Sequence, residues 1–320
     1  MKEFDIIGNF FQPRSYQRRD VVIGIGDDCA VTSVPEKQQL AVTTDTLVEG
    51  VHFPKDTSAR AIAHKAVAVN LSDLAAMGAE PAWISLSLSL PQVDEAWLNE
   101  FSATLQELTE YYSVQLIGGD TVRGPLSITI TAQGFLPTDQ ALRRSQAKPG
   151  DWIYVTGTLG DAALGLDLAL GKRDVKLHHQ NYFLNRLNLP TPRVLAGTQL
   201  RRIAHSCIDV SDGVISDLKH ILFASQVGAT LHVDKLPFSE AMLESATEEE
   251  AIHYALTGGD DYELLFTIAE EQKGKLDVAL ANYNVSATCI GQLNGTPEKL
   301  ELKYNDAPFQ TSSEGFQHFA

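Results

Sequence analysis

Aspartates follow short apolar runs at five places in this sequence. The runs end at Asp27-Asp28, Asp45, Asp120, Asp209 and Asp260-Asp261. Strand ends are where α/β proteins place their chemistry. Carboxylates gathered there repel one another unless a cation lies between them. A single Gly-Asp pair is explained by turn formation alone. Five such endings after apolar runs instead favour a shared site for hard divalent cations.

The ligand types favour magnesium or manganese over zinc, because they offer oxygen with no cysteine and little histidine nearby. Magnesium usually takes only one or two protein carboxylates and completes its shell with water and phosphate. The candidate carboxylates are too many for one ion, so they suit several ions that bridge a polyphosphate. They are Asp28, Asp45, Asp73, Asp120, Asp209 and Asp212.

Other catalytic signatures are scarce. The sequence has no GxxxxGK[ST] loop and none of the protein-kinase motifs. Arg123 and the pair Arg143-Arg144 are candidates for phosphate contacts, since a guanidinium fork matches phosphate oxygens, although a solvated surface pair is the alternative. His52 follows the Asp45 run closely, but a lone histidine is more often structural. Nothing in the sequence links Ser211 to a catalytic base.

Composition and charge argue against several classes of protein. The 320 residues are 44% hydrophobic and 21% charged, which is ordinary for a globular chain of one or two domains. The net charge is −16 and no Lys/Arg block occurs, so nucleic acid and an acidic membrane surface are not expected partners. The three cysteines lie far apart, the N-terminus lacks a signal-peptide core, and no apolar stretch is long enough to span a bilayer. We therefore expect a cytoplasmic protein.

Periodicity predicts a mixed α/β fold. Residues 83–90 and 126–131 alternate apolar and small polar side chains, which indicates half-buried strands in an antiparallel or mixed sheet with one thinly covered face. A second subunit could pair with that face. Residues 59–77 and 94–112 read as helices, the first stopped by Gly78 and the second started by acids.

A turn at Lys148-Pro149-Gly150-Asp151 predicts a junction between two domains, residues 1–147 and 148–320. The second half also reads as α/β. We expect helices over 160–171, from Pro192, over 213–227 and over 270–282, with strands at 152–157, 229–233, 262–268 and 286–290.

The motifs resemble the thiamine-monophosphate kinase family, in order and over nearly the whole chain. They include Gly24–Ala30, Thr43–Phe53, Ala68–Gly78, Leu116–Thr121, Ile208–Gly213 and Gly258–Leu264. The Asn-Leu-Ser-Asp and Gly-Gly-Asp types occur throughout a wider superfamily, which includes aminoimidazole ribonucleotide synthetase. The resemblance implies a two-domain aminoimidazole ribonucleotide synthetase-like fold, with N-terminal domains that pair into a homodimer through a β-barrel and ATP between the two domains.

The implied reaction transfers the γ-phosphoryl group of ATP in line onto thiamine monophosphate, giving thiamine diphosphate. The acceptor is already an anion, so no general base is needed, and the barrier is mostly charge repulsion and positioning. By the resemblance, Asp120, Arg144 and Asp212 would act in catalysis. Gly119, Asp120, Arg144 and Ser211 would contact ATP. His52, Asp260 and Phe316 would contact the substrate. Several Mg²⁺ ions would be held by Asp28, Thr43, Thr44, Asp45, Asp73, Asp120, Asp209 and Asp212.

Two positions match the family pattern less directly than the others. The family usually has Gly-Gly-Glu-Asp where this chain has Gly259-Asp260-Asp261, so the acid at 260 is one methylene shorter. Phe316 fits the place of an aromatic that meets the thiamine rings, and Phe319 is the alternative.

Two other functions stay open. One is another ATP-dependent synthetase of the superfamily, although no cysteine precedes Gly24 as selenophosphate synthesis would require, and no cysteine ends the chain as hydrogenase maturation would require. The other is a non-catalytic magnesium-nucleotide sensor, against which the intact acids of every motif argue.

Overall fold

The computed structural model describes residues 3–12 and 16–311. The chain forms two units. Unit 1 comprises residues 1–74 and 79–139, and unit 2 comprises residues 75–78 and 140–320.

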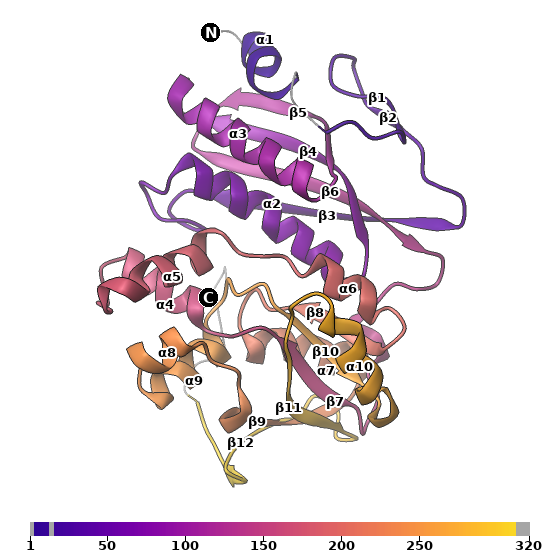
Figure 1. Ribbon diagram of the computed structural model, residues 1–320, viewed down its shortest axis with the longest axis vertical. Helices are drawn as coiled ribbons and strands as arrows, with labels where there is room; N and C mark the ends of the chain where they lie inside the picture. The colour runs from indigo at the N-terminus through magenta and orange to yellow at the C-terminus, as the bar shows by residue number, and fades with distance from the viewer. Residues whose placement is uncertain (1–2, 13–15, 312–320) are drawn as a thin grey trace. The chain divides into compact units, whose positions relative to one another are not determined.

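Unit 1 is built on a four-stranded sheet in the order β3-β6-β4-β5 (Figure 1). β6 pairs antiparallel with both β3 and β4, whereas β4 and β5 are parallel, so the predicted mixed sheet is confirmed. The elements of unit 1 are α1 (Glu3–Ile6), a π-helical turn (Ile7–Phe11), β1 (Val21–Ile23), β2 (Val31–Thr32), β3 (Gln38–Val48), α2 (Ala59–Ala76), β4 (Glu80–Leu90), α3 (Glu95–Tyr111), β5 (Gln115–Arg123) and β6 (Ser127–Pro137).

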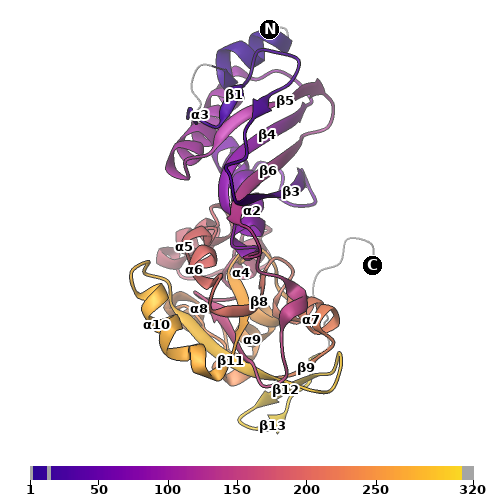
Figure 2. The same cartoon turned by 90° about the vertical axis from the view of Figure 1, so that its right-hand side faces the viewer.

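The two faces of this sheet differ in covering. Helices α2 and α3 lie on one face (Figures 1 and 2), and the buried side chains of the strands, such as Leu86 and Ile130, belong to it. The other face, called the open face below, consists of the intervening small polar and apolar side chains. Leu40 and Val42 on it are 42% and 59% exposed. Its members are Leu40, Val42, Thr44, Thr46, Ser85, Ser87, Ser89, Thr129 and Thr131. The predicted thinly covered face is therefore present.

Both predicted helices of unit 1 are confirmed to within one residue. The alanine-rich α2 is buried along most of its length, because its small side chains allow close packing on the sheet. Gly78, with φ of 70°, follows its end. Asp94 caps α3 by accepting the N–H groups of Ala96 and Trp97.

The segment before β1 is tied to the sheet by side chains. Asp20 accepts hydrogen bonds from Arg18 Nε (3.0 Å) and from the buried indole of Trp83 (2.8 Å). Gln115 Oε1 accepts the Arg18 N–H at 2.7 Å. The chain that leads to Asp28 thus starts from a fixed position on unit 1.

Unit 2 contains a seven-stranded sheet in the order β13-β12-β9-β11-β7-β10-β8, which is antiparallel except for the pair β12 and β9. The strands and helices predicted there are present within a few residues, whereas α5, α8, α9 and β12 were not predicted. The elements are a 3₁₀ turn (Arg144–Gln146), β7 (Trp152–Thr156), α4 (Asp161–Ala169), α5 (Leu177–Asn188), α6 (Val194–Leu200), β8 (Ala204–Asp209), α7 (Val214–Ser225), β9 (Gly228–His232), α8 (Glu240–Ser245), α9 (Glu248–Thr257), β10 (Leu264–Ile268), α10 (Lys273–Ala281), β11 (Ala287–Asn294), β12 (Leu300–Tyr304) and β13 (Ala307–Pro308).

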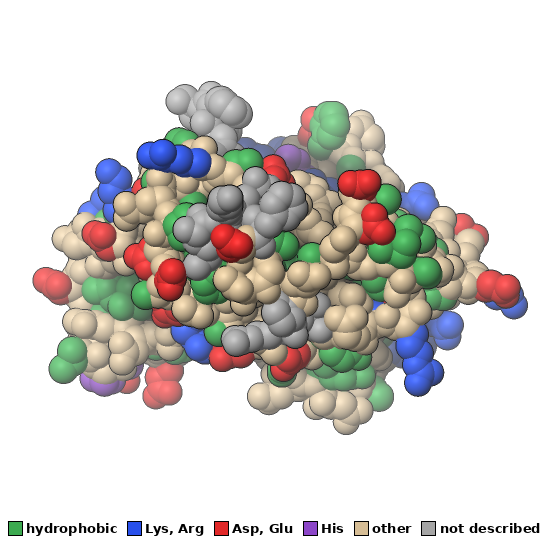
Figure 3. Space-filling view, turned by 90° about the horizontal axis from the view of Figure 1, so that it is seen from above, with side chains coloured by type: hydrophobic (Ala, Val, Ile, Leu, Met, Phe, Trp, Pro, Cys, Tyr) green, Lys and Arg blue, Asp and Glu red, His purple; other side chains and the backbone are tan. Residues whose placement is uncertain are grey.

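Within the described residues, no helix is long and apolar enough to cross a membrane. On the face shown in Figure 3, the Lys and Arg side chains of these residues stand apart from one another and form no continuous basic surface.

Candidate functional site

Three of the predicted ligands meet on the covered face of the unit 1 sheet. Thr43 and Asp45 are two residues apart on β3, so they point to the same side, toward α2. The Thr43 hydroxyl donates a short hydrogen bond to Asp73 Oδ2 on that helix. Asp45 lies close enough to Asp73 for their charges to interact. Burial and the charge of Asp73 raise the pKa of Asp45 to about 6.

Thr44 points to the opposite side of β3. Its hydroxyl is 2.9 Å from the Thr131 hydroxyl on the open face. A contact from Thr44 to an ion beside Asp45 would therefore have to use its main chain.

Asp120 lies on β5, at the other edge of the sheet. It pairs with Ser87 of β4, an open-face residue, and is exposed. Gly119, which precedes it, cannot be replaced without a shift of β4, because a Cβ there would overlap the carbonyl oxygen of Leu86.

The strand register separates Asp45 from Asp120. Asp45 pairs with Ile130, Ile130 with Leu86, and Leu86 with Gly119. Three strand spacings of about 4.8 Å put the two edges about 14 Å apart. The folded chain therefore brings Thr43, Asp45 and Asp73 together but leaves Asp120 on another edge.

The two remaining candidates of unit 1 lie in loops. Asp28 is exposed in a turn where its N–H donates to Asp27 Oδ1 at 2.9 Å. The half-buried ring of His52 accepts the Val48 N–H through Nδ1 at 3.0 Å.

In unit 2, a second acid cluster follows β8. Asp209 is buried at the end of this strand, and Ser211 and Asp212 form the turn into α7. Asp217, in the first turn of α7, accepts the N–H groups of Ser211 (3.0 Å) and Asp212 (3.1 Å) with one carboxylate oxygen. Asp217 therefore fixes the backbone of the loop that carries the predicted ligands.

Asp217 is itself in an unfavourable electrostatic environment. Burial raises its pKa to about 8, the charges of Asp209 and Asp212 add to this, and the two N–H bonds oppose it.

The loop with Asp260 is bound directly to this cluster. The Asp260 N–H donates to Ser211 O (2.9 Å) and the Tyr262 N–H to Val210 O (2.9 Å). The Tyr262 hydroxyl donates to Asp260 Oδ1 at 3.1 Å. A side chain at Gly259 would overlap the Ser211 carbonyl oxygen, so this close approach requires glycine. The structure thus brings Asp260 together with Asp209, Ser211 and Asp212.

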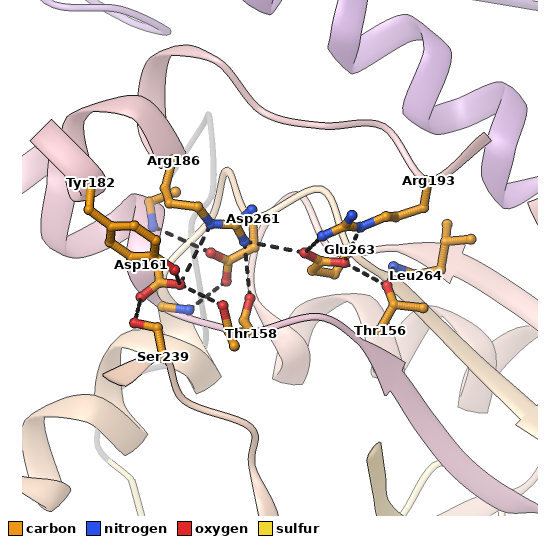
Figure 4. A network of polar contacts seen from close by, with 12 residues as sticks. Thr156, Thr158, Asp161, Tyr182, Arg186, Arg193, Ser239, Asp261, Glu263 and Leu264 are labelled. Carbon is orange, nitrogen blue, oxygen red and sulfur yellow. Dashed lines mark hydrogen bonds and ion pairs between the residues drawn. The ribbon is translucent and has the colours of Figure 1, made fainter. Parts of the chain in front are cut away.

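Beneath that loop lies a buried ion-pair network (Figure 4). Arg193 binds Glu263 through two hydrogen bonds of 2.6 Å, and Thr156 donates a third at 2.6 Å. Arg186 lies 3.3 Å from Glu263 and 3.6 Å from Asp161. Sequence reasoning did not single out this network, because its members are far apart in the chain.

The network contains one more acid than it has arginines. Asp161, Asp261 and Glu263 face Arg186 and Arg193, and Asp261 accepts the Gly160 N–H at 2.7 Å. Burial raises the pKa of Asp261 to about 8, with Asp161 adding and Arg186 opposing. A proton on Asp261 at neutral pH makes the network electrically neutral.

Two further residues, Arg144 and Phe316, were predicted to contact ATP and the substrate. Arg144 is exposed on its 3₁₀ turn, and its carbonyl accepts the Ser225 hydroxyl of α7 at 2.6 Å. Phe316 and Phe319 lie outside the described residues.

The donor sets fit magnesium. Around Asp45 and around Asp209 the candidate ligands are carboxylates, hydroxyls and main-chain oxygens, which are the ligands of a hard cation. A cation beside Asp45 and Asp73 would also offset the repulsion that raises the Asp45 pKa.

Family models match both halves of the chain. The N-terminal domain of AIR synthase related proteins matches residues 26–136, and the C-terminal domain matches residues 148–303.

Similar proteins of known name cover almost the entire chain. Thiamine-monophosphate kinase of Escherichia coli (strain K12) is 51% identical over 319 residues, which is 99% of this chain and 98% of that protein. The crystal structure of thiamine-monophosphate kinase from Stenotrophomonas maltophilia K279a has a TM-score of 0.87 at 42% identity, covering 95% of this chain and 97% of that one. The structure of AaThiL complexed with AMPPCP and TMP has a TM-score of 0.78 at 28% identity, covering 99% and 96%.

The Asp261 carboxyl gives a pH-dependent prediction. Its pKa in the folded protein, about 8, lies above the ordinary 3.8, so the folded state holds the extra proton between these values. The free energy of unfolding therefore falls as pH rises through this window, by at most about 1.4 kcal/mol per pH unit from this group. Asp261→Asn can still accept the Gly160 N–H but does not titrate. We expect its stability relative to the wild type to increase from pH 5 to pH 8.

Urea unfolding at several pH values measures this difference. Asp94→Asn, which keeps the N-cap of α3, is the matched control and should follow the wild-type curve. Parallel curves for Asp261→Asn and the wild type would show that Asp261 is ionised in the folded protein throughout.

Proposed function

Because this chain belongs to the thiamine-monophosphate kinase family of AIR synthase related proteins, we propose that it transfers the γ-phosphoryl group of ATP to thiamine monophosphate. The observation that carries the proposal is 51% identity to a thiamine-monophosphate kinase across 99% of the chain. The complex of a 28% identical protein with AMPPCP and TMP supports the same pair of substrates.

The acids of each unit have the chemistry that such a reaction needs. Two anionic phosphates must approach in line, and their repulsion is the main part of the barrier. We assign Asp28, Thr43, Thr44, Asp45, Asp73, Asp120, Asp209 and Asp212 to binding Mg²⁺. Bound Mg²⁺ would supply positive charge to the phosphate oxygens of both substrates.

The other proposed contacts follow from side-chain chemistry. The exposed guanidinium of Arg144 is suited to phosphate oxygens of ATP, together with Gly119 and Ser211. We also assign His52, whose ring is held by the Val48 N–H, to the substrate. Tyr262 orients the Asp260 carboxylate, and this hydrogen bond offers a way for the shorter acid to keep a defined position. Phe316 is assigned to the thiamine rings.

We also propose a homodimer. The open face of the unit 1 sheet carries exposed Leu40 and Val42 among hydroxyl side chains, which is a surface that a second copy can cover. β3 and β5 each pair with one strand only among the described strands, so each has an unpaired edge. Two such sheets would make eight strands, the number at which side chains just fill a closed barrel.

A direct assay tests the activity. Purified protein with ATP, Mg²⁺ and thiamine monophosphate should form thiamine diphosphate and ADP, measured by chromatography. Asp120→Asn should lower turnover by about 100-fold or more, because it removes a carboxylate ligand of the Mg²⁺ that would offset phosphate repulsion, while circular dichroism shows the fold intact. Asp94→Asn should keep wild-type turnover. Near-normal activity in Asp120→Asn would remove Asp120 from the ligand set.

Asp217 should position the second cluster without contacting substrate. Asp217→Leu keeps the shape of the side chain but leaves the N–H groups of Ser211 and Asp212 without their acceptor. We expect the Mg²⁺ concentration for half-maximal activity to rise about 10- to 100-fold, as for other residues that orient metal ligands. Asp217→Asn, which still offers an oxygen, should stay close to the wild type.

The control for this prediction is another buried acid. Asp151 is 3% exposed and accepts the Lys148 N–H at 2.8 Å, but it precedes β7, at the opposite end of β10 from Asp209. Asp151→Leu should lower thermal stability and leave the Mg²⁺ requirement unchanged. An equal effect of both Leu variants on the Mg²⁺ requirement would mean that loss of stability, and not loop position, is responsible.

A further inference from the structure

Two histidines and a glutamate lie close together on the surface of unit 2, outside the loops that carry the proposed Mg²⁺ ligands. His178 and His179 occupy the first turn of α5, and Glu244 lies near the end of α8. Each of the three residues offers a ligand atom within 4.8 Å of those of the other two. Imidazole nitrogen together with carboxylate oxygen is a ligand set for Zn²⁺ and similar divalent cations, whereas Mg²⁺ prefers oxygen alone.

The distances suit a tetrahedral ion. His179 Nε2 lies 3.2 Å from Glu244 Oε2. Two ligands that each lie about 2.0–2.2 Å from one Zn²⁺ are separated by about 3.4 Å, so this pair already has nearly the required spacing. The His178 ring is exposed and its centroid lies 4.0 Å from that of the His179 ring. Its nitrogen has to move by at most about 1.4 Å to join the other two, and water can take the fourth position.

Lys176 is the side chain that such an ion would displace. Its Nζ lies 2.9 Å from Glu244 Oε2, the oxygen that also faces His179. The Lys176 side chain is 57% exposed, so its ammonium can move into water when a cation binds. An exposed ion pair contributes little to stability, so its loss is a small cost. The ion pair gives no role to His178, whereas the metal site requires it.

The start of α5 is weakly fixed by the rest of the structure. Its N-cap residue, Lys176, makes no side-chain hydrogen bond to the helix, and Leu177 is 79% exposed. The buried side chains of α5, Phe183 and Leu187, lie in its later turns. An ion held by the histidines and Glu244 would fasten the first turn of α5 to α8.

We propose that His178, His179 and Glu244 bind Zn²⁺ and that the ion links α5 to α8. The site is separate from the ion-pair network below the Asp260 loop. Arg186, which belongs to that network, lies in the last turn of α5, about 10 Å along the helix from His179. Zinc binding at this place is independent of the proposed kinase function, and its test needs neither ATP nor thiamine monophosphate.

Zinc titration of the protein without a histidine tag tests the site. Excess Mg²⁺ is present throughout to occupy the acids proposed for the kinase reaction, and a chromophoric chelator competes for Zn²⁺. The wild type should bind one Zn²⁺ that His178→Ala and His179→Ala each bind at least about 10-fold more weakly. Residues that only orient metal ligands contribute about 10- to 100-fold to affinity, so the loss of a ligand should cost no less.

Two further variants sharpen the titration. His253→Ala is the matched control, because His253 is another exposed histidine on a helix of unit 2, and this variant should bind Zn²⁺ as tightly as the wild type. Lys176→Met should bind Zn²⁺ about 2- to 5-fold more tightly, because the ammonium no longer competes for Glu244 Oε2. Unchanged or weaker binding in Lys176→Met would contradict the competition that this geometry requires.

Thermal unfolding gives a second readout. Zn²⁺ should raise the melting temperature of the wild type more than that of His178→Ala, since an ion that binds only the folded state stabilises it. The His178 ring is exposed, so its removal should leave the fold intact, which circular dichroism verifies. Wild-type zinc affinity in His178→Ala would show that Lys176, His179 and Glu244 form an ion pair only, and would refute the site.

Discussion

Repulsion between neighbouring carboxylates is the constraint on which this structure depends. The chain meets it in two ways. Around Glu263, partly buried arginines supply the opposing charge, and a raised pKa lets Asp261 hold a proton. Around Asp45, burial and the nearby Asp73 raise the pKa toward neutrality. The first arrangement is internally balanced and stabilises a loop. The second would be relieved by a cation from solution, as we propose for Mg²⁺.

Two neighbouring acids in Gly259-Asp260-Asp261 have different environments. Asp260 has φ of 70°, so the chain reverses there, and neighbouring acids point to different places. Asp261 turns inward to the start of α4, and Asp260 stays at the Asp209–Asp212 loop. The Arg193–Glu263 pair below holds both by fixing the end of the loop at β10. A structural ion pair thus supports the loop that carries Asp260, the acid we assign to the substrate.

Sequence reasoning predicted the elements with strong local signals. Alternation predicted the strands around Ile84 and Ile130. The alanine run and the acids at the start of the second helix predicted the helices of unit 1. It missed α5, whose residues are largely polar, because its burial depends on Phe183 and Leu187 alone. The candidate acids could be identified from the sequence, because each of them lies in a short contiguous motif. The Arg193–Glu263 pair spans 70 residues and has no local signal.

The order of the strands in the unit 1 sheet could not be predicted from the spacing of the motifs along the sequence. This order determines which acids of the chain lie close together. β6 follows β5 in sequence, yet it lies between β3 and β4. This insertion makes β3 and β5 the edges and carries the Asp45 and Asp120 motifs to opposite sides of the sheet. Had β5 lain next to β3, one chain would hold both acids within reach of the same phosphates. The observed order instead makes β3 and β5 edges of the same direction, each paired with one strand only among the described strands.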